Sequence, residues 1–422
     1  MRRGQVRLAL LAAPLLAAAI AATAGSAPVS AAQPIRIGFG LALTGPLAAN
    51  GRMALLGMKI WRDDINKKGG LLGRPVAFVV YDDQSNPATV PGIYTKLLDV
   101  DKVDLVVSGY GTNMIAPAMP VIMQHGRTFL SLFGLAVNAQ FHYPRYFTIT
   151  PTGPNAPIAV TKPFFEVAAA QNPKPKTLAI IAADAEYPRA ASAGVREDAK
   201  AFGLKIVYDR TYPPTTTDYT PIIQAVQATH PDAVFVASYP LDTVGIVRAA
   251  NEVGLNTKIF GGGMVGLQTT SIKTELGPLL NGIVNYDFWL PAPTMRFAGV
   301  MDFLKKYQAR AVKEGVDPLG YYLGPWGYTY LQVLGEAVEG CKCLDQNKLA
   351  DYLRGHTFKT VMGDIKFGPD GELAQSRVLM VQFQHVKSNA LDEFKDGKNP
   401  IIVWPKKYRD GKVIYPYTAA RS

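Results

Sequence analysis

The sequence predicts an α/β protein of two similar halves, each built around a mostly parallel β-sheet. Strand patterns alternate with helix patterns from residue 35 to residue 132, and the alternation begins again after Pro151-Thr152-Gly153-Pro154. Such alternation favours a parallel sheet that is covered by helices on both faces. The length of 422 residues and the hydrophobic fraction of 48% allow two domains with well-filled cores.

The first half contains one helix with a clear apolar face. Ala54, Met58, Trp61 and Ile65 recur at spacings of four, three and four residues, and Gly69-Gly70 follows as a stop signal. Strands are predicted at residues 35–41, 76–81, 104–108 and 128–132. Further helices are predicted at residues 88–98 and 114–124.

The second half repeats this order and ends in a polar tail rich in Lys, Tyr and Pro. Its strands are predicted at residues 177–182, 205–208, 233–237, 258–260, 283–288 and 377–385. Its helices are predicted at residues 189–202, 221–229, 242–253, 294–314 and 321–339.

The N-terminal segment has the pattern of a secretory signal peptide. Three arginines among the first seven residues precede an apolar run over 8–24, and Val29-Ser30-Ala31-Ala32 supplies small residues for cleavage near Ala31 or Ala32. The alternative is a retained membrane anchor, because the run is near the lower limit for a span. We expect residues 1–32 to be removed and the mature chain to be exported and soluble.

The charge pattern argues against a nucleic-acid-binding protein. The formal net charge is +11, but the basic residues are scattered and form no block of five or six like charges. A nucleic-acid-binding protein would concentrate them on one element. A mild attraction for small anions is the expectation that remains.

The two cysteines, Cys341 and Cys343, are too few for a disulfide scaffold, and no zinc-ligand spacing accompanies them. In an oxidising compartment they either close a small ring or remain thiols. Both outcomes stay open, and in either case we expect the two cysteines to have a local, structural role.

Motifs of hydrolases, metalloproteases and nucleotide-binding enzymes are absent from the sequence. There is no G-x-S-x-G elbow, no H-E-x-x-H and no P-loop lysine. Gly38-Phe39-Gly40 and Gly261-Gly262-Gly263 lack the context of a dinucleotide fingerprint and are interpreted as tight turns. The five histidines lie far apart. A binding protein without catalytic residues, cofactor or metal is therefore favoured over an exported enzyme.

Several segments resemble the leucine/isoleucine/valine-binding protein family, the type I periplasmic solute receptors of ABC importers. Their order and spacing carry the resemblance, which extends over essentially the whole mature chain. The matching segments are Gly38-Phe39-Gly40-Leu41-Ala42-Leu43-Thr44-Gly45-Pro46, Asp64-Ile65-Asn66-Lys67-Lys68-Gly69-Gly70 with Gly73, Tyr81-Asp82-Asp83 with Asn86-Pro87, Tyr187, Tyr239, Gly254-Leu255 and Val361-Met362-Gly363.

This resemblance implies the type I periplasmic binding protein fold, which has two Rossmann-like lobes, three hinge crossovers and a ligand in the cleft. The crossovers are expected near residues 150–154, 287–291 and 376–378. The N-terminal lobe is then expected to comprise 33–152 and 289–376. The C-terminal lobe is expected to comprise 153–288 and 377–422.

Thr112 is the first candidate for ligand binding. It follows a predicted strand and precedes a predicted helix, so its hydroxyl and the free N–H groups of the helix start suit a carboxylate. The family places a carboxylate-binding Ser or Thr at the matching position. The alternative is that Thr112 and Asn113 only cap the helix. Tyr110 and residues 133–135 lie beyond strand ends, where ligands bind in open α/β sheets, and Asn50 matches a cleft-lining position of the family.

The chain departs from the amino-acid-binding members of that family where they hold the α-ammonium. Leu135 and Gly263 align with the hydroxyl-bearing and acidic residues of those members, and residues 260–268 contain no Asp or Glu. A buried ammonium without a counter-charge costs several kcal/mol. The resemblance and its departures together predict a carboxylate ligand that has no α-amino group.

Aromatic residues near the expected cleft favour a ring-bearing ligand, because offset stacking adds about 0.5–1.5 kcal/mol beyond burial. The alternative for several of them is core packing, and we expect about three to contact the ligand. These aromatic residues are Tyr110, Phe133, Tyr187, Tyr239, Trp289, Tyr321 and Tyr322. The complete set of candidate ligand-binding residues is Thr112, Asn113, Tyr110, Asn50, Phe133, Gly134, Leu135, Tyr187, Tyr239 and Gly263.

The sequence therefore predicts a monomeric periplasmic substrate-binding protein that delivers a small, aromatic carboxylate to an inner-membrane ABC permease. The runner-up is a true branched-chain amino-acid-binding protein. An exported α/β enzyme, or a sensor of the same fold, is the alternative from another class. No catalytic residue, cofactor, metal or nucleic-acid partner is expected.

Overall fold

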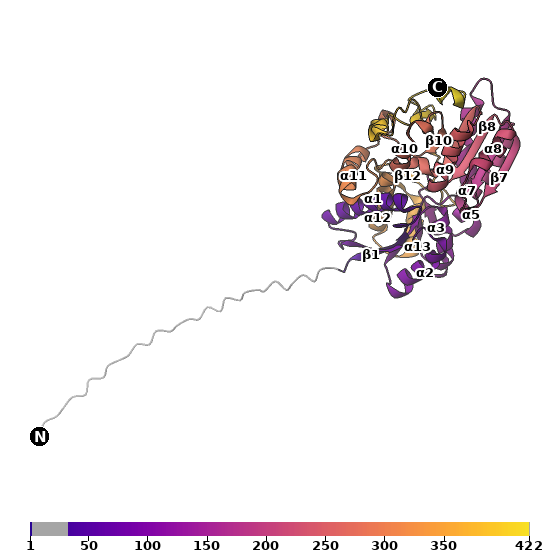
Figure 1. Cartoon of the computed structure of the whole chain (residues 1–422). Helices are drawn as coiled ribbons and strands as arrows, with labels where there is room; N and C mark the ends of the chain where they lie inside the picture. The colour runs from indigo at the N-terminus through magenta and orange to yellow at the C-terminus, as the bar shows by residue number, and fades with distance from the viewer. Residues whose placement is uncertain (2–32, 422) are drawn as a thin grey trace.

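The computed structural model describes Met1 and residues 33–421, so the predicted signal peptide and its cleavage region lie outside the described residues. Two mostly parallel sheets and their covering helices form the body of the protein (Figure 1). The predicted fold class, two α/β halves with parallel sheets, is confirmed. Among the described residues, no helix combines the length and apolar character that a membrane crossing needs.

The first sheet has the strand order β2-β1-β3-β4-β5, and its strand pairs are all parallel. The predicted strands of this half are confirmed to within two residues, but β5 is missing from the prediction because it has only three residues. The strands are β1 (Ile35–Leu41), β2 (Val76–Asp82), β3 (Leu105–Tyr110), β4 (Phe129–Leu132) and β5 (Tyr146–Thr148).

Around the first sheet, α1 (Ala48–Lys67) buries Ala54, Met58 and Trp61 on the apolar face that the spacing predicted. The segment predicted as one helix over 88–98 is divided into η1 (Pro87–Thr89), α2 (Val90–Thr95) and η2 (Lys96–Val100). Pro87 and Pro91 cannot donate helix hydrogen bonds, which accounts for the irregular start. Next come α3 (Thr112–Ile115), η3 (Ala116–Ala118), α4 (Met119–Gln124) and α5 (Val137–Phe141).

The second sheet has the strand order β14-β13-β10-β9-β8-β6-β7. Strand β13 runs antiparallel to both of its neighbours, and the remaining pairs are parallel. The strands are β6 (Thr177–Ala183), β7 (Lys205–Tyr212), β8 (Ala233–Ser238), β9 (Ile259–Met264), β10 (Val284–Asp287), β13 (Leu379–Gln382) and β14 (Ile401–Trp404).

The interpretation of the C-terminal segment as only a polar tail is wrong. Strand β14 extends the second sheet, and Tyr417 is buried with its ring centroid 5.3 Å from that of Phe260. The run Ile401–Trp404 is four residues long and stands between lysine-rich stretches. Its strand character therefore depends on pairing with β13.

The helices beside the second sheet are α6 (Ala156–Ala169), α7 (Glu186–Phe202), α8 (Thr220–Ala228), α9 (Pro240–Val253) and α10 (Thr270–Leu276), with η4 (Val265–Gln268) and η5 (Gly277–Leu280). The chain continues through η6 (Pro293–Met295), α11 (Val300–Glu314), α12 (Leu323–Cys341), α13 (Gln346–Gly355) and the hairpin β11 (Thr357–Thr360) and β12 (Gly363–Lys366). The C-terminal part of the chain also contains three short 3-10 helices, η7 (Leu391–Glu393), η8 (Lys395–Gly397) and η9 (Tyr417–Arg421).

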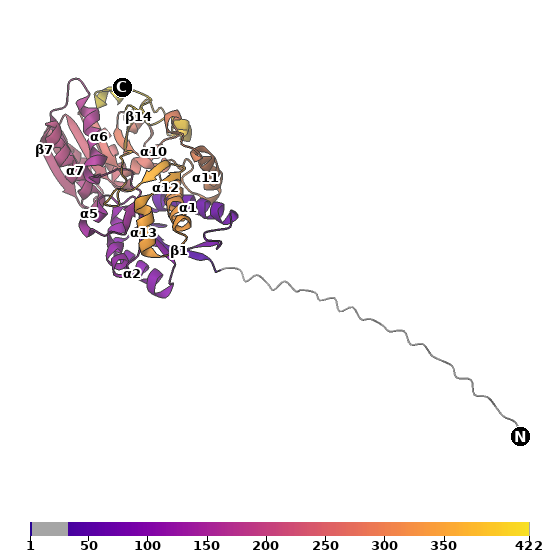
Figure 2. The same cartoon turned by 180° about the vertical axis from the view of Figure 1, so that it is seen from behind.

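Helix α12 packs against α1, although more than two hundred residues separate them, and both views show them side by side (Figure 2). Glycines permit the close approach. A Cβ atom on Gly57 would lie 2.2 Å from the Gly324 carbonyl oxygen, and one on Gly327 would lie 2.6 Å from the Ala54 carbonyl oxygen. The chain thus returns to the first sheet after building most of the second.

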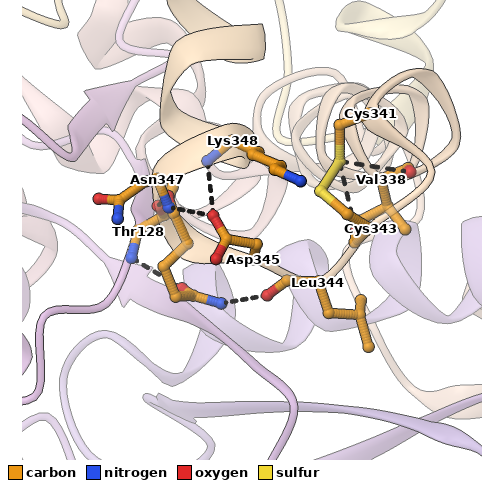
Figure 3. Close-up of a disulfide and its surroundings, with 9 residues drawn as sticks. Thr128, Val338, Cys341, Cys343, Leu344, Asp345, Asn347 and Lys348 are labelled. Atoms are coloured by element: carbon orange, nitrogen blue, oxygen red, sulfur yellow. Dashed lines mark hydrogen bonds between the residues drawn. A yellow bond between two sulfur atoms is a disulfide. The ribbon is translucent and has the colours of Figure 1, made fainter.

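The two cysteines form a disulfide at the end of α12 (Figure 3), which decides between the two outcomes left open by the sequence. Beside it, the Asp345 carboxylate accepts hydrogen bonds from the N–H groups of Asn347 and Lys348 and so caps α13. This region is remote from the strand ends described below, and its role is local.

We expect Gly57→Ala to lower the free energy of unfolding by about 1–3 kcal/mol, because the added methyl group overpacks the contact between α1 and α12. Urea unfolding followed by circular dichroism measures the change. Gly92→Ala is the matched control, since a Cβ atom there meets nothing within 4 Å. It should be neutral or stabilising by about 0.4–1 kcal/mol. Equal stability of both variants would contradict the close packing.

Candidate functional site

A cavity lies where the carboxyl ends of the two sheets face each other. The end of β3 and the residues that follow β3, β4 and β5 line it from the first sheet. Residues that follow β6, β8 and β9, and residues in and after β10, line it from the second. Val160 of α6 and Tyr322 at the start of α12 complete the lining. The lining residues are Tyr110, Gly111, Thr112, Phe133, Leu135, Thr150, Thr152, Val160, Tyr187, Tyr239, Val265, Tyr286, Phe288 and Tyr322.

The topology explains this position. Strands β2-β1-β3-β4-β5 and β7-β6-β8-β9-β10 have the same relative order, and ligands of such open sheets bind beyond the carboxyl ends of the strands. At the end of β3, Gly111 has φ of +89°, which lets the chain turn directly into the helical segment that begins at Thr112.

The cavity is compact. The space left for the centres of water-sized molecules is about 30 Å³, and one water needs roughly 10–15 Å³ in that measure. The wall is mostly aromatic: the Phe133 ring centroid lies 5.1 Å from that of Phe288 and 5.5 Å from that of Tyr322. The Tyr187 and Tyr239 centroids are 5.9 Å apart on the other side. Such a space suits a small molecule with a flat apolar body.

The phenol groups of the wall are engaged by the protein. The Tyr187 hydroxyl donates to the Gly263 carbonyl at 3.0 Å, and the Tyr239 hydroxyl donates to Asn113 Oδ1 at 2.7 Å. The Tyr322 hydroxyl lies 3.3 Å from that of Tyr110 and 3.4 Å from that of Tyr286. Burial raises the pKa of each of these phenols above its usual range, so they are neutral hydrogen-bonding groups.

Thr112 presents a free donor to the cavity. Its Oγ1 accepts a hydrogen bond from the Leu135 N–H at 3.0 Å, which leaves its own hydroxyl hydrogen available. The N–H groups of Thr112 and Asn113 stand at the start of the helical segment, where no preceding turn supplies an acceptor. These donors can together hold an anionic oxygen.

No charged side chain is among the lining residues that the structure describes. Two acids adjoin lining residues along the chain, and neither lines the cavity. Glu186 precedes Tyr187 and forms an ion pair with Arg189 at 3.1 Å. Asp287 follows Tyr286, and its Oδ1 accepts the Phe288 N–H at 2.7 Å. Burial raises the pKa of Asp287 to about 6, and Lys273 opposes that rise. The cavity therefore offers hydrogen-bond donors for an anion and no carboxylate for a cation.

The sequence-predicted site residues divide into two groups. Tyr110, Thr112, Phe133, Leu135, Tyr187 and Tyr239 line the cavity. The other four candidates do not. Gly134 and Gly263 contribute carbonyls that accept from Thr150 Oγ1 and from the Tyr187 hydroxyl. Asn50 is fully buried in α1, and its amide atoms have no hydrogen-bond partner among the described residues.

Asn113, the fourth, connects the two sides of the cleft. Its Oδ1 accepts hydrogen bonds from the Tyr187 N–H at 3.2 Å and from the Tyr239 hydroxyl at 2.7 Å. Asn113 and Tyr239 also line an outer groove of about 1010 Å³, and Tyr239 lines the inner cavity as well. The Asn113–Tyr239 contact therefore stands between the groove and the cavity.

Several lining residues were absent from the candidate set: Gly111, Thr150, Thr152, Val160, Val265, Tyr286 and Phe288. Tyr322 was expected only as a nearby aromatic. Thr150 and Thr152 belong to the first expected crossover, and Phe288 belongs to the second. The position of these residues in the expected crossovers is the sequence feature that could have identified them as lining residues. Trp289 and Tyr321, also expected near the cleft, pack on each other with centroids 6.0 Å apart and do not line the cavity.

Comparison with known proteins agrees with this architecture. Residues 34–390 match the family described as periplasmic binding protein. The leucine-, isoleucine-, valine-, threonine- and alanine-binding protein of Pseudomonas aeruginosa is 25% identical over 377 residues, covering 88% of this chain and 95% of that protein.

Two solved structures show the same fold. The branched-chain amino acid substrate-binding protein LivJ of Streptococcus pneumoniae, in complex with isoleucine, has a TM-score of 0.70 at 19% identity, covering 91% of this chain and 100% of that one. A solute-binding protein of an ABC transporter from Rhodopseudomonas palustris, in complex with 3,4-dihydroxybenzoic acid, has a TM-score of 0.69 at 20% identity. The match covers 84% of this chain and 94% of that one.

We expect Asn113→Ala to loosen the contact across the cleft, because the Tyr187 N–H and the Tyr239 hydroxyl both lose their acceptor. Small-angle scattering of the free protein should show a larger radius of gyration, with an unchanged circular dichroism spectrum. Tyr239→Phe removes one of the two bonds and should give a smaller increase. Radii equal to that of the wild type in both variants would show that this contact does not hold the cleft closed.

Proposed function

The chain belongs to the periplasmic binding protein family, and we propose that it binds a small aromatic carboxylate without an α-ammonium and delivers it to an ABC permease. The observation that carries this proposal is the absence of any acid among the described lining residues, in a cavity that offers several donors. An amino acid enclosed there would bury its ammonium without a counter-charge, at a cost of several kcal/mol.

The carboxylate of the ligand is placed at Thr112. The free hydroxyl hydrogen and the N–H groups at the start of the helical segment are donors, and hydrogen bonds to charged groups contribute roughly 1.5–3 kcal/mol each. Because Leu135 N–H already donates to Thr112 Oγ1, the hydroxyl is oriented before the ligand arrives. Less ordering is then required on binding.

The ring of the ligand is placed against the aromatic wall. Phe133, Phe288 and the tyrosines offer faces and edges at contact distance from one another. That a relative of the same fold, from Rhodopseudomonas palustris, is found with 3,4-dihydroxybenzoic acid supports an aromatic acid as ligand.

Closure of the cleft is the proposed mechanism. We place the N-terminal lobe at residues 33–152 and 289–376 and the C-terminal lobe at residues 153–288 and 377–422, joined by the three crossovers. A ligand that contacts both lobes favours the closed state by its differential affinity for that state. The chain would act as an exported monomer that binds its ligand without cofactor or turnover.

Isothermal titration tests the ligand class. We expect benzoate or 3-phenylpropanoate to bind, and leucine and phenylalanine to bind far more weakly, because only the amino acids bury an ammonium. A bound acid at about 100 times its dissociation constant should also stabilise the protein by roughly 2.7 kcal/mol. Tight binding of leucine with no response to any aromatic acid would overturn the proposal in favour of a branched-chain amino-acid-binding protein.

Thr112→Ala should weaken binding of the aromatic acid by roughly 10- to 150-fold, because a hydrogen bond to the carboxylate is lost. Thr112→Ser keeps the hydroxyl and is the matched control, with affinity close to that of the wild type. Thermal unfolding of both variants without ligand shows that they are folded. Unchanged affinity of the alanine variant would leave Thr112 with only a structural role.

A further inference from the structure

Thr152 differs from the other hydroxyl-bearing residues that line the cavity. Thr112 accepts from the Leu135 N–H, Thr150 bonds to the Gly134 carbonyl, and each tyrosine hydroxyl lies near a protein partner. Thr152 Oγ1 is fully buried and has no hydrogen-bond partner in the described part of the chain. It is an unpartnered hydroxyl in the wall of the ligand cavity.

An unpartnered buried hydroxyl is costly. Leaving one unsatisfied costs about 1–3 kcal/mol, so most buried polar side chains have a partner. Valine has nearly the same shape and would avoid this cost. A threonine at this position is therefore explained most simply by a partner that arrives with the ligand.

The backbone around Thr152 leaves the hydroxyl little freedom to find another partner. The Thr152 N–H donates to the Thr150 carbonyl at 2.8 Å, and the Arg377 N–H donates to the Pro151 carbonyl at 2.8 Å. Gly153 has φ of +77°, and a Cβ atom there would lie 2.6 Å from the backbone nitrogen of Ser376. These contacts between the first and third crossovers thus hold the segment in place beside the cavity.

We propose that Thr152 is a specificity-determining residue that binds a hydroxyl group on the ring of the ligand, which makes a hydroxylated aromatic acid the preferred substrate class. This inference rests on the proposed function. A threonine hydroxyl both donates and accepts, as does a phenolic hydroxyl. A neutral group also fits here, because one hydroxyl cannot by itself compensate a buried ammonium or a second carboxylate where the described lining residues carry no charge.

Isothermal titration of the full exported chain with benzoate and with 2-, 3- and 4-hydroxybenzoate tests the inference. We expect the wild type to bind one hydroxybenzoate isomer about 3- to 10-fold more tightly than benzoate, the range for a neutral hydrogen bond. Thr152→Val should remove this preference while benzoate affinity stays equal or rises. Thr152→Ser should retain the preference.

Thr329→Val is the matched control. Thr329 Oγ1 is also fully buried and unpartnered among the described residues, but it lies in α12 and does not line the cavity. Its loss should leave every ligand affinity unchanged, and thermal unfolding reports the folding of all variants.

The outcomes separate the two proposals. Binding of benzoates with the same isomer preference in the wild type and Thr152→Val overturns the role of Thr152 alone. An equal loss of affinity for every acid in Thr152→Val also overturns it, since Thr152 would then hold the carboxylate. No binding of any benzoate by the wild type overturns both the proposed function and this inference.

Discussion

The structure depends on one constraint: the tyrosine hydroxyls buried around the aromatic cavity must find hydrogen-bond partners. The tyrosine hydroxyls meet it by reaching across the cleft. Tyr110 from β3 and Tyr286 from β10 both approach the Tyr322 hydroxyl at the start of α12. Tyr239 reaches Asn113 on the opposite side. The Tyr286–Tyr322 and Tyr239–Asn113 contacts therefore satisfy phenol hydroxyls and connect the two sides of the cavity at the same time.

The fold supplies the geometry that this constraint requires. Two sheets of the same relative strand order turn their carboxyl ends toward one space, so short loops after the strands can supply most of the lining. Helix α12 returns to pack on α1 through Gly57 and Gly324, which fixes Tyr322 at the junction of the two sheets. Backbone contact between Pro151 and Arg377 then joins the first crossover to the third.

Much of this could be predicted from local sequence. Buried strands and the apolar stripe of α1 have strong periodicity, and a threonine between a strand and a helix indicated Thr112. Strands β5 and β14 are too short to show a pattern. The role of Asn113 could not be predicted, because its amide oxygen meets groups 74 and 126 residues away. For Thr152, composition marked the crossover, but only packing shows that this residue lines the cavity and that its hydroxyl is left without a partner among the described residues.

The uncharged lining bears on which class of ligand the cavity accepts. In the proposed function, Thr112 and main-chain groups hold the acid of the ligand, and main-chain groups depend on the fold more than on side-chain identity. The remaining lining residues that the structure describes are apolar residues, tyrosines and the hydroxyl-bearing Thr150 and Thr152. Leu135 in the lining and Gly263 beside it occupy the positions where amino-acid-binding relatives are expected to hold an ammonium. We expect that different residues at those two positions remove an ammonium site without disturbing the carboxylate donors. Selectivity can therefore change between amino acids and aromatic acids while strand order, crossovers and closure stay the same.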